Sequence, residues 1–150
     1  MNRNVQQQLT KEFRNHLSRQ ERLCERLEQL ADSLPDAINV QESLYVAQSL
    51  LPTVMLTHRF EEDRLFPLLR GAHNASTLPY TLDRLGFEHM ADEEYAHDIT
   101  LSLRAYIAGG RTGNADALAW MMRSFFEALR RHIAFEREHV LPLLEQDVRH

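Results

Sequence analysis

Three histidine–glutamate pairs recur in this sequence with the same spacing. They are His58 with Glu62, His89 with Glu93, and His132 with Glu136. A separation of four residues is slightly more than one turn of an α-helix, so the two side chains of each pair share one helix face. Imidazole nitrogen suits iron, zinc and copper, whereas carboxylate oxygen suits harder ions and can bridge two of them. The repeated spacing therefore indicates metal binding.

His16 is a fourth histidine in a setting where a polar side chain is unusual. It lies on the apolar line that Leu9 and Phe13 form in the first helical stretch. His58 lies in the same way on the apolar line of LTHRFEEDRLFPLL, residues 56–69. A buried polar group without a partner costs roughly 1–3 kcal/mol of stability. Taken singly, each histidine is more simply a core residue with an ordinary partner; taken together, the four favour a metal site.

Helix-breaking sequences divide the chain into four long segments in which apolar residues recur at helical spacing. The breaks are SLPD at 33–36, GAHNASTLP at 71–79 and GGRTGN at 109–114. Asp36 is a candidate cap for the second helix, and Asn114 or Asp116 for the fourth. Pro52 is expected to kink or split the second helix. The pattern predicts one all-α domain over residues 1–150, an antiparallel up-down-up-down four-helix bundle.

The four histidines are expected near the mid-height of that bundle. In antiparallel helices, residues equally far from the shared turn lie at similar heights. The histidines and glutamates of neighbouring segments differ in this distance by a few residues, or several Å at about 1.5 Å per residue. The four histidines and three glutamates would form one polar layer. These are too many donors for one ion, but they suit two ions that share a bridging carboxylate.

Composition narrows the function classes. The formal net charge of −5 argues against a nucleic-acid partner. No apolar run is long enough to span a bilayer, and the start, MNRNVQQQLTKEF, has no apolar stretch of the signal-peptide type. Cys24 is the single cysteine, which excludes an internal disulfide and a zinc site built from cysteines. These features predict a cytoplasmic protein with no membrane or nucleic-acid partner.

With these residues identified, the chain resembles the hemerythrin-like family, also called the HHE cation-binding family. The resemblance rests on His16 followed by the three His-x-x-x-Glu pairs. It also rests on the prolines that end HRFEEDRLFP and HIAFEREHVLP. It extends over essentially all of residues 1–150. It implies a four-helix bundle around two non-heme iron ions with an oxo or hydroxo bridge, although zinc or manganese stays open as the metal.

The resemblance also implies a role for each ligand. His16 and His58 would bind one iron, His89 and His132 the other, and Glu62 and Glu136 would bridge the two. Glu61, three residues after His58, is an alternative or an addition to Glu62. Glu12 and Glu88 are candidate outer partners for a ligand imidazole, although solvated surface charge is the simpler interpretation.

Glu93 is a departure from the oxygen-carrying members, which have a second histidine at its position. An additional carboxylate would stabilise ferric iron and could fill the open coordination position. Reversible oxygen carriage is therefore disfavoured. The resemblance instead implies binding of, or reaction with, oxygen, nitric oxide or peroxide, within iron handling and oxidative or nitrosative stress.

Several functions stay open at this point. Weak peroxidase- or catalase-like activity and nitric oxide reduction are the candidate enzyme activities. Iron storage or donation, or di-iron repair with an iron-protein client, is the alternative. A metal-free helical interaction module is disfavoured by the buried polar layer. One further feature is a weak internal similarity between FEEDRLFPLL (60–69) and FEREHVLPLL (135–144), which suggests a duplicated helix pair.

Overall fold

The computed structural model describes residues 3–72 and 77–149, and within these ranges the regular structure is entirely helical. The α-helices and the two π-helices, η1 and η2, are α1 (Arg3–Ser33), α2 (Val40–Phe60), η1 (Glu61–Leu65), α3 (Phe66–Ala72), α4 (Leu78–Ala108), α5 (Ala115–Phe135), η2 (Glu136–Val140) and α6 (Leu141–Arg149). The all-α prediction is confirmed. The predicted breaks at 33–36 and 109–114 each lie between two long helices, and residues 73–76 of the break at 71–79 lie outside the described residues.

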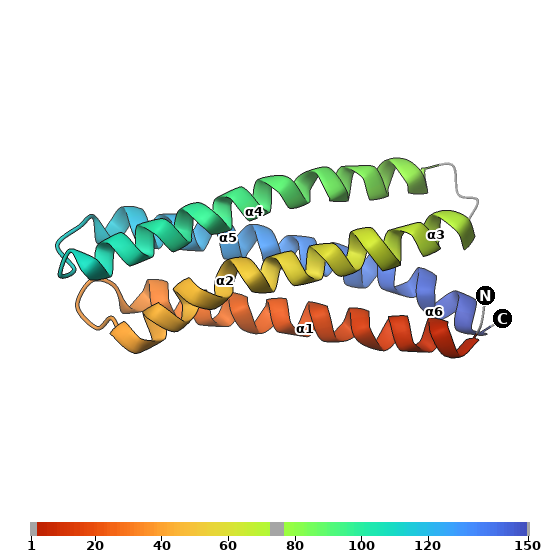
Figure 1. The fold of residues 1–150 in the computed structure, drawn as a ribbon, viewed down its shortest axis with the longest axis horizontal. Coiled ribbons are helices and arrows are strands. Elements are labelled where there is room, and N and C mark those ends of the chain that lie inside the picture. The colour runs from red at the N-terminus through yellow and green to blue at the C-terminus, as the bar shows by residue number, and fades with distance from the viewer. Residues whose placement is uncertain (1–2, 73–76, 150) are drawn as a thin grey trace.

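The helices form four long stretches that lie side by side, with the two ends of the chain at the same end of the molecule (Figure 1). The stretches are α1, then α2 continued by η1 and α3, then α4, and finally α5 continued by η2 and α6. α1 packs against α2 and α5, and α4 packs against the same two helices. Each long stretch therefore has two neighbours, and all four enclose one interior.

Local signals fix where the helices begin and end. The side chain of Asn39 accepts a hydrogen bond from the Glu42 N–H at 3.0 Å and caps α2, in place of the expected Asp36. Asn114 caps α5 in the same way through the N–H of Ala117, as one of the two predicted alternatives. After α4, Gly110 adopts a φ of +71°, a backbone conformation that glycine takes without steric cost.

The two π-helices lie at corresponding positions of the two similar segments, 60–69 and 135–144. In η1 the Phe66 N–H bonds to the Glu61 carbonyl, and in η2 the Leu141 N–H bonds to the Glu136 carbonyl. The next residue in each case is a proline, which has no N–H and whose ring clashes with the carbonyl four residues before it. A widened turn relieves that clash. α2, by contrast, continues through Pro52, so the expected split at that residue does not occur.

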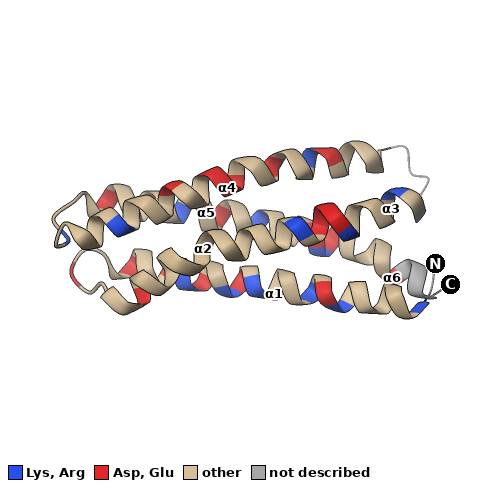
Figure 2. Cartoon of the chain, in the orientation of Figure 1, with Lys and Arg blue, Asp and Glu red and all other residues tan. Residues whose placement is uncertain are grey.

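The interior of the bundle is largely apolar. Phe13, Leu17, Leu50, Leu82 and Met122 are among its fully buried side chains. Acidic and basic residues are interspersed along the helices (Figure 2). Within the described ranges, no helix has an apolar stretch long enough to cross a membrane.

Candidate metal centre

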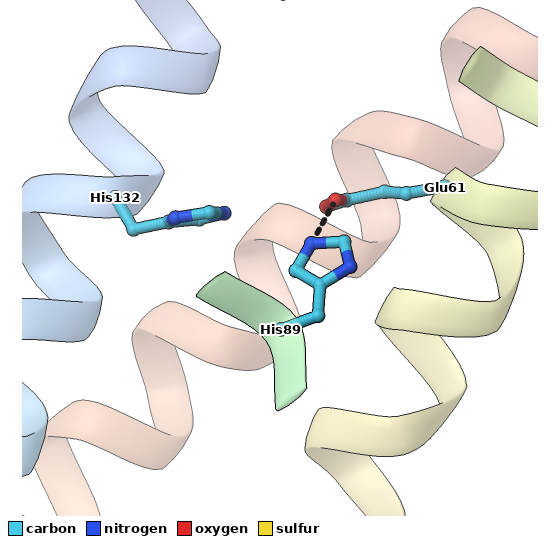
Figure 3. Close-up of side chains that lie close together, drawn as sticks. All are labelled: Glu61, His89 and His132. Atoms are coloured by element: carbon cyan, nitrogen blue, oxygen red, sulfur yellow. Dashed lines mark ion pairs between the residues drawn. The ribbon is translucent and has the colours of Figure 1, made fainter. Parts of the chain in front are cut away.

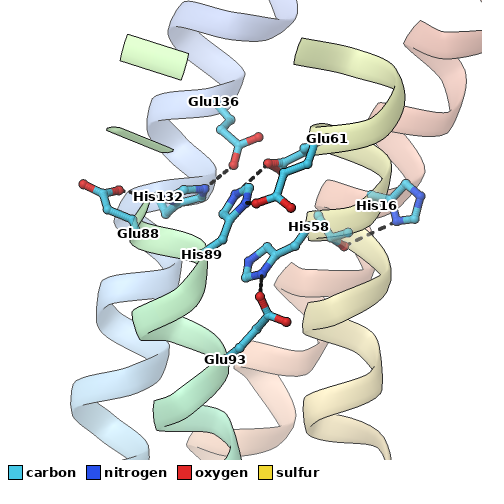
Figure 4. A network of polar contacts seen from close by, with 10 residues as sticks. His16, His58, Glu61, Glu88, His89, Glu93, His132 and Glu136 are labelled. Atoms are coloured by element: carbon cyan, nitrogen blue, oxygen red, sulfur yellow. Dashed lines mark hydrogen bonds and ion pairs between the residues drawn. The ribbon is translucent and has the colours of Figure 1, made fainter. Parts of the chain in front are cut away.

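Three of the four predicted histidines meet in the interior. His58 comes from α2, His89 from α4 and His132 from α5, and their rings are turned toward one another (Figure 4). The rings of His58 and His89 stack with centroids 3.8 Å apart, and those of His89 and His132 are 5.8 Å apart. Their side chains are 3%, 0% and 9% exposed, respectively. The imidazoles thus form one buried group to which three helices contribute.

Two buried glutamates complete this group. Glu61 and Glu136 are the first residues of η1 and η2, and both side chains are fully buried. Glu61 Oε2 lies 3.0 Å from His89 Nε2, and Glu136 Oε1 contacts His132 Nε2. Ligand atoms of Glu61, His89 and His132 all lie within 4.8 Å of one another, as their convergence in Figure 3 illustrates. We call these five residues, His58, Glu61, His89, His132 and Glu136, the inner cluster.

The inner cluster contains seven buried polar atoms that make no hydrogen bond. They are Nε2 of His58, His89 and His132 and both carboxylate oxygens of Glu61 and Glu136. Glu61 and His89 are close, but their contact does not have hydrogen-bond geometry. Burial of each such atom costs roughly 1–3 kcal/mol, and more if the group is charged. Bound cations would remove this cost, so the donor set fits a metal centre.

A second set of carboxylates lies on the other edge of each imidazole. His58 Nδ1 is 3.2 Å from Glu93, and His89 Nδ1 is 2.9 Å from Glu62. His132 Nδ1 is 3.6 Å from Glu88, a longer electrostatic contact. Figure 4 shows Glu88 and Glu93 on the outer sides of His132 and His58. We call Glu62, Glu88 and Glu93 the outer carboxylates; their side chains are 44%, 43% and 31% exposed.

This arrangement selects one form of each imidazole. A carboxylate next to Nδ1 favours a proton on that nitrogen, which leaves the Nε2 lone pair free for a metal. Burial lowers the pKa of His58 to about 2, with further lowering by His89 and His132. The His58 ring is therefore neutral at physiological pH. An outer carboxylate also increases the electron density that an imidazole can donate to a metal.

The buried carboxyl group of Glu61 has the opposite titration behaviour. Burial, followed by the nearby charge of Glu136, raises the pKa of Glu61 well above its ordinary value. Burial on its own would lower the pKa of His132, but the close contact with Glu136 and its negative charge outweigh burial and raise that pKa. Without a cation, the cluster therefore retains protons that a bound cation would displace.

The structure places the predicted residues in two groups. His58, His89, His132 and Glu136 meet in the inner cluster, as expected from the sequence. Glu62 and Glu93, which were expected to bind metal, lie among the outer carboxylates, and Glu61 occupies the inward position. The physical reason is the geometry of the helix. Viewed along the helix axis, the residues three and four positions after His58 lie on opposite sides of the His58 side chain, so the spacing alone does not determine which glutamate points inward.

The internal similarity contained the missing information. It aligns Glu61, and not Glu62, with Glu136, because each stands at the same distance before Pro67 or Pro142. Those prolines follow the two π-helices, and each π-helix begins with the buried glutamate. The position of the proline is therefore a better guide to the buried carboxylate than the His-x-x-x-Glu spacing.

His16 lies apart from the inner cluster. Its ring stacks on Phe60 with centroids 4.7 Å apart, and its Nδ1 is 3.3 Å from the hydroxyl oxygen of Thr57. Figure 4 shows it on α1, beside α2. Burial, followed by the charge of Arg19, lowers the pKa of His16. Phe60 and Thr57 both belong to α2, so the expected partnership of His16 with His58 on one ion is not visible in the arrangement.

Comparison with known proteins gives one match. The family model described as the hemerythrin HHE cation binding domain matches residues 7–144. The matched range includes all five residues of the inner cluster and all three outer carboxylates. Neither a curated protein nor a solved structure gives a significant match.

Proposed function

Because the chain belongs to the hemerythrin family of HHE cation-binding domains, we propose that it is a non-heme di-iron protein. In this proposal an antiparallel up-down-up-down bundle holds two iron ions with an oxo or hydroxo bridge. The observation that carries the proposal is the set of seven buried, unpartnered donor atoms in the inner cluster. That number exceeds the six positions of one octahedral ion.

The inner cluster assigns a role to each residue. His58, His89 and His132 would each bind metal through Nε2. Glu61 and Glu136 would supply the carboxylate oxygens that hold the ions, and Glu61 thereby takes the role that the sequence pattern gave to Glu62. The outer carboxylates would hold the imidazoles in the correct tautomer. His16 is left out of this ligand set because its ring packs on Phe60 and its Nδ1 is close to Thr57.

When bound, a di-iron centre supplies electrons to, or coordinates, a small oxidant such as oxygen, nitric oxide or peroxide. The chain contributes a largely buried layer and holds the donor atoms in position before the ions arrive. We place its function in the handling of iron and of oxidative or nitrosative stress, with turnover of peroxide or nitric oxide as the candidate activity.

The outer carboxylates favour oxidation of the centre over reversible oxygen carriage. A carboxylate next to Nδ1 strengthens electron donation by the imidazole, and this stabilises the higher oxidation state of the metal. All three imidazoles of the inner cluster have such a neighbour. Glu93 thus acts through His58 in this proposal, without itself binding iron.

Spectroscopy of the reduced, iron-loaded protein tests this function. Anaerobic protein should change its visible absorption when oxygen, peroxide or nitric oxide is added, and after oxygen it should end in the oxidised form. An oxygenated form that is stable for hours and is reversed under vacuum would contradict the proposal and favour an oxygen carrier. A spectrum unchanged by all three reagents would contradict any role in oxidant chemistry.

A further inference from the structure

A cleft between α4 and α5 leads toward the inner cluster. It has a volume of about 330 Å³, and its walls include Glu88, Asp92, Ala128, Arg131 and His132. Among the three clustered imidazoles, His132 has the most exposed side chain, and it lines this cleft. Its Nε2 atom is buried and has no hydrogen-bond partner. The cleft therefore brings solvent close to an unpartnered donor of the candidate centre.

Asp92 is the carboxylate in this cleft that is not engaged elsewhere. Within the described part of the chain it makes no hydrogen bond or ion pair, whereas Glu88 contacts both Arg84 and His132 at 3.6 Å. Asp92 is partly buried, and its charge acts on both His132 and His89. A cation in the cleft would therefore find an uncommitted oxygen donor close to two imidazoles of the inner cluster.

Two other hollows on the surface lack this combination. The hollow between α1 and α5 has a similar volume, about 390 Å³, but Ile133 forms part of its wall and its Glu21 is paired with Arg137. A third hollow, between α1 and α2, is lined by Arg19, Arg22 and Arg26, which repel cations. The cleft next to His132 thus differs from both in having a histidine of the inner cluster, as well as a carboxylate, in its walls.

We propose that divalent cations reach the inner cluster through this cleft and that Asp92 is the donor they meet on the way. The proposal rests on the proposed metal centre and adds its access route. A hydrated divalent ion must exchange water for protein ligands, and a carboxylate oxygen is a suitable first replacement. Arg84 and Arg131 also line the cleft, but Arg84 contacts Glu88, and the negative charge of Asp92 attracts cations locally. The ion then passes to His132 and Glu136, which lie next to each other.

The rate of metal uptake tests the role of Asp92. Metal-free protein is mixed rapidly with Co²⁺, and the visible absorption of the bound ion is followed with time. The substitution Asp92→Asn should slow uptake by roughly tenfold, the lower end of the rate gains that such charged clefts provide. It should leave the final metal content unchanged. Asp98→Asn is the matched control, because it removes the same charge from an exposed position on α4.

Filling the cleft tests the route independently of charge. Ala128 is exposed and lines the cleft, and Ala134 is exposed and lines the hollow between α1 and α5. Ala128→Trp should slow uptake several-fold, whereas Ala134→Trp should not. Uptake at the unmodified rate in Ala128→Trp would overturn the route. A lower final metal content in Asp92→Asn would show that Asp92 is a ligand and overturn its assigned role. Unmodified protein that binds no cation would overturn the proposed centre itself.

Discussion

The inner and outer carboxylates around the imidazoles are the same kind of side chain in two different environments. Glu61 and Glu136 are fully buried and have no hydrogen-bond partner. Glu62, Glu88 and Glu93 are partly exposed and lie next to Nδ1 of a histidine. A hydrated carboxylate needs no counter-ion, whereas a buried one needs a cation or a proton. Burial, more than residue type or spacing, thus separates the residues suited to bind metal from those suited to orient a ligand.

Removal of metal should have the largest effect of all, a loss of folded-state stability, because it affects every atom of the inner cluster. Metal present at about a thousand times its dissociation constant stabilises the folded state by roughly 4 kcal/mol. For a domain of this size that corresponds to a fall in Tm of about 10 °C in the metal-free protein. Calorimetry with and without a chelator measures the difference. Equal melting temperatures would show that the inner cluster is stable without cations.

Loss of one inner carboxylate should be the next largest effect. Glu61→Gln retains the shape of the side chain but removes the charge that would bridge the ions. We expect the metal affinity to fall by roughly 100-fold or more, beyond the range typical of an orienting residue. Competition with a coloured chelator measures it, and Glu62→Gln is the matched control one position along the chain. A greater loss for Glu62→Gln than for Glu61→Gln would reverse the assignment of the two residues.

The pH dependence of metal binding tests the protonation state of the inner cluster. Burial raises the pKa of Glu61, so this residue must lose a proton before it binds a cation. Burial lowers the pKa of His58 to about 2, so this imidazole is already free of its proton at higher pH. Metal affinity should therefore increase with pH below the raised pKa of Glu61, by about tenfold per pH unit for each proton displaced. An affinity that is constant or falls as the pH rises toward the raised pKa of Glu61 would contradict the protonated state of the metal-free cluster.

Loss of an outer carboxylate should have the smallest effect. Glu93→Gln leaves a group next to His58 Nδ1 but removes its charge, so the metal affinity should fall by about tenfold. Titration with Co²⁺ measures this change, and Glu94→Gln, at an exposed neighbouring position, should have no effect. Loss of a whole metal equivalent in Glu93→Gln would indicate that Glu93 binds an ion directly, as the sequence pattern suggests.

Much of the fold could be predicted from the sequence because its signals are local. The breaks SLPD, GAHNASTLP and GGRTGN each separate long helices, and Asn114 caps the helix that it precedes. Residues 73–76 of the second break lie outside the described residues. The choice of Asn39 over Asp36 as a cap depends on where the loop turns into the helix. The π-helices were not predicted, although the proline near the end of the second and of the fourth helical segment is the signal that could have indicated them.

The candidate site was predictable only to the level of which helix face points inward. Residues on that face, such as His89 and Glu136, meet as expected. The choice between Glu61 and Glu62 depends on burial, and burial depends on how η1 packs against α4. The position of His16 likewise depends on the Phe60 ring, which occupies space next to it. Such packing arises from side chains distant in sequence, and helical periodicity contains no record of it.

The number of iron ions per chain tests the central claim most directly. Metal-free protein is loaded with ferrous iron without oxygen, freed of excess metal, and analysed for iron and protein by independent methods. Because seven unpartnered donor atoms face one another in the inner cluster, we expect close to two iron ions per chain. A value of one, or none, after complete loading would contradict a di-iron centre at these residues.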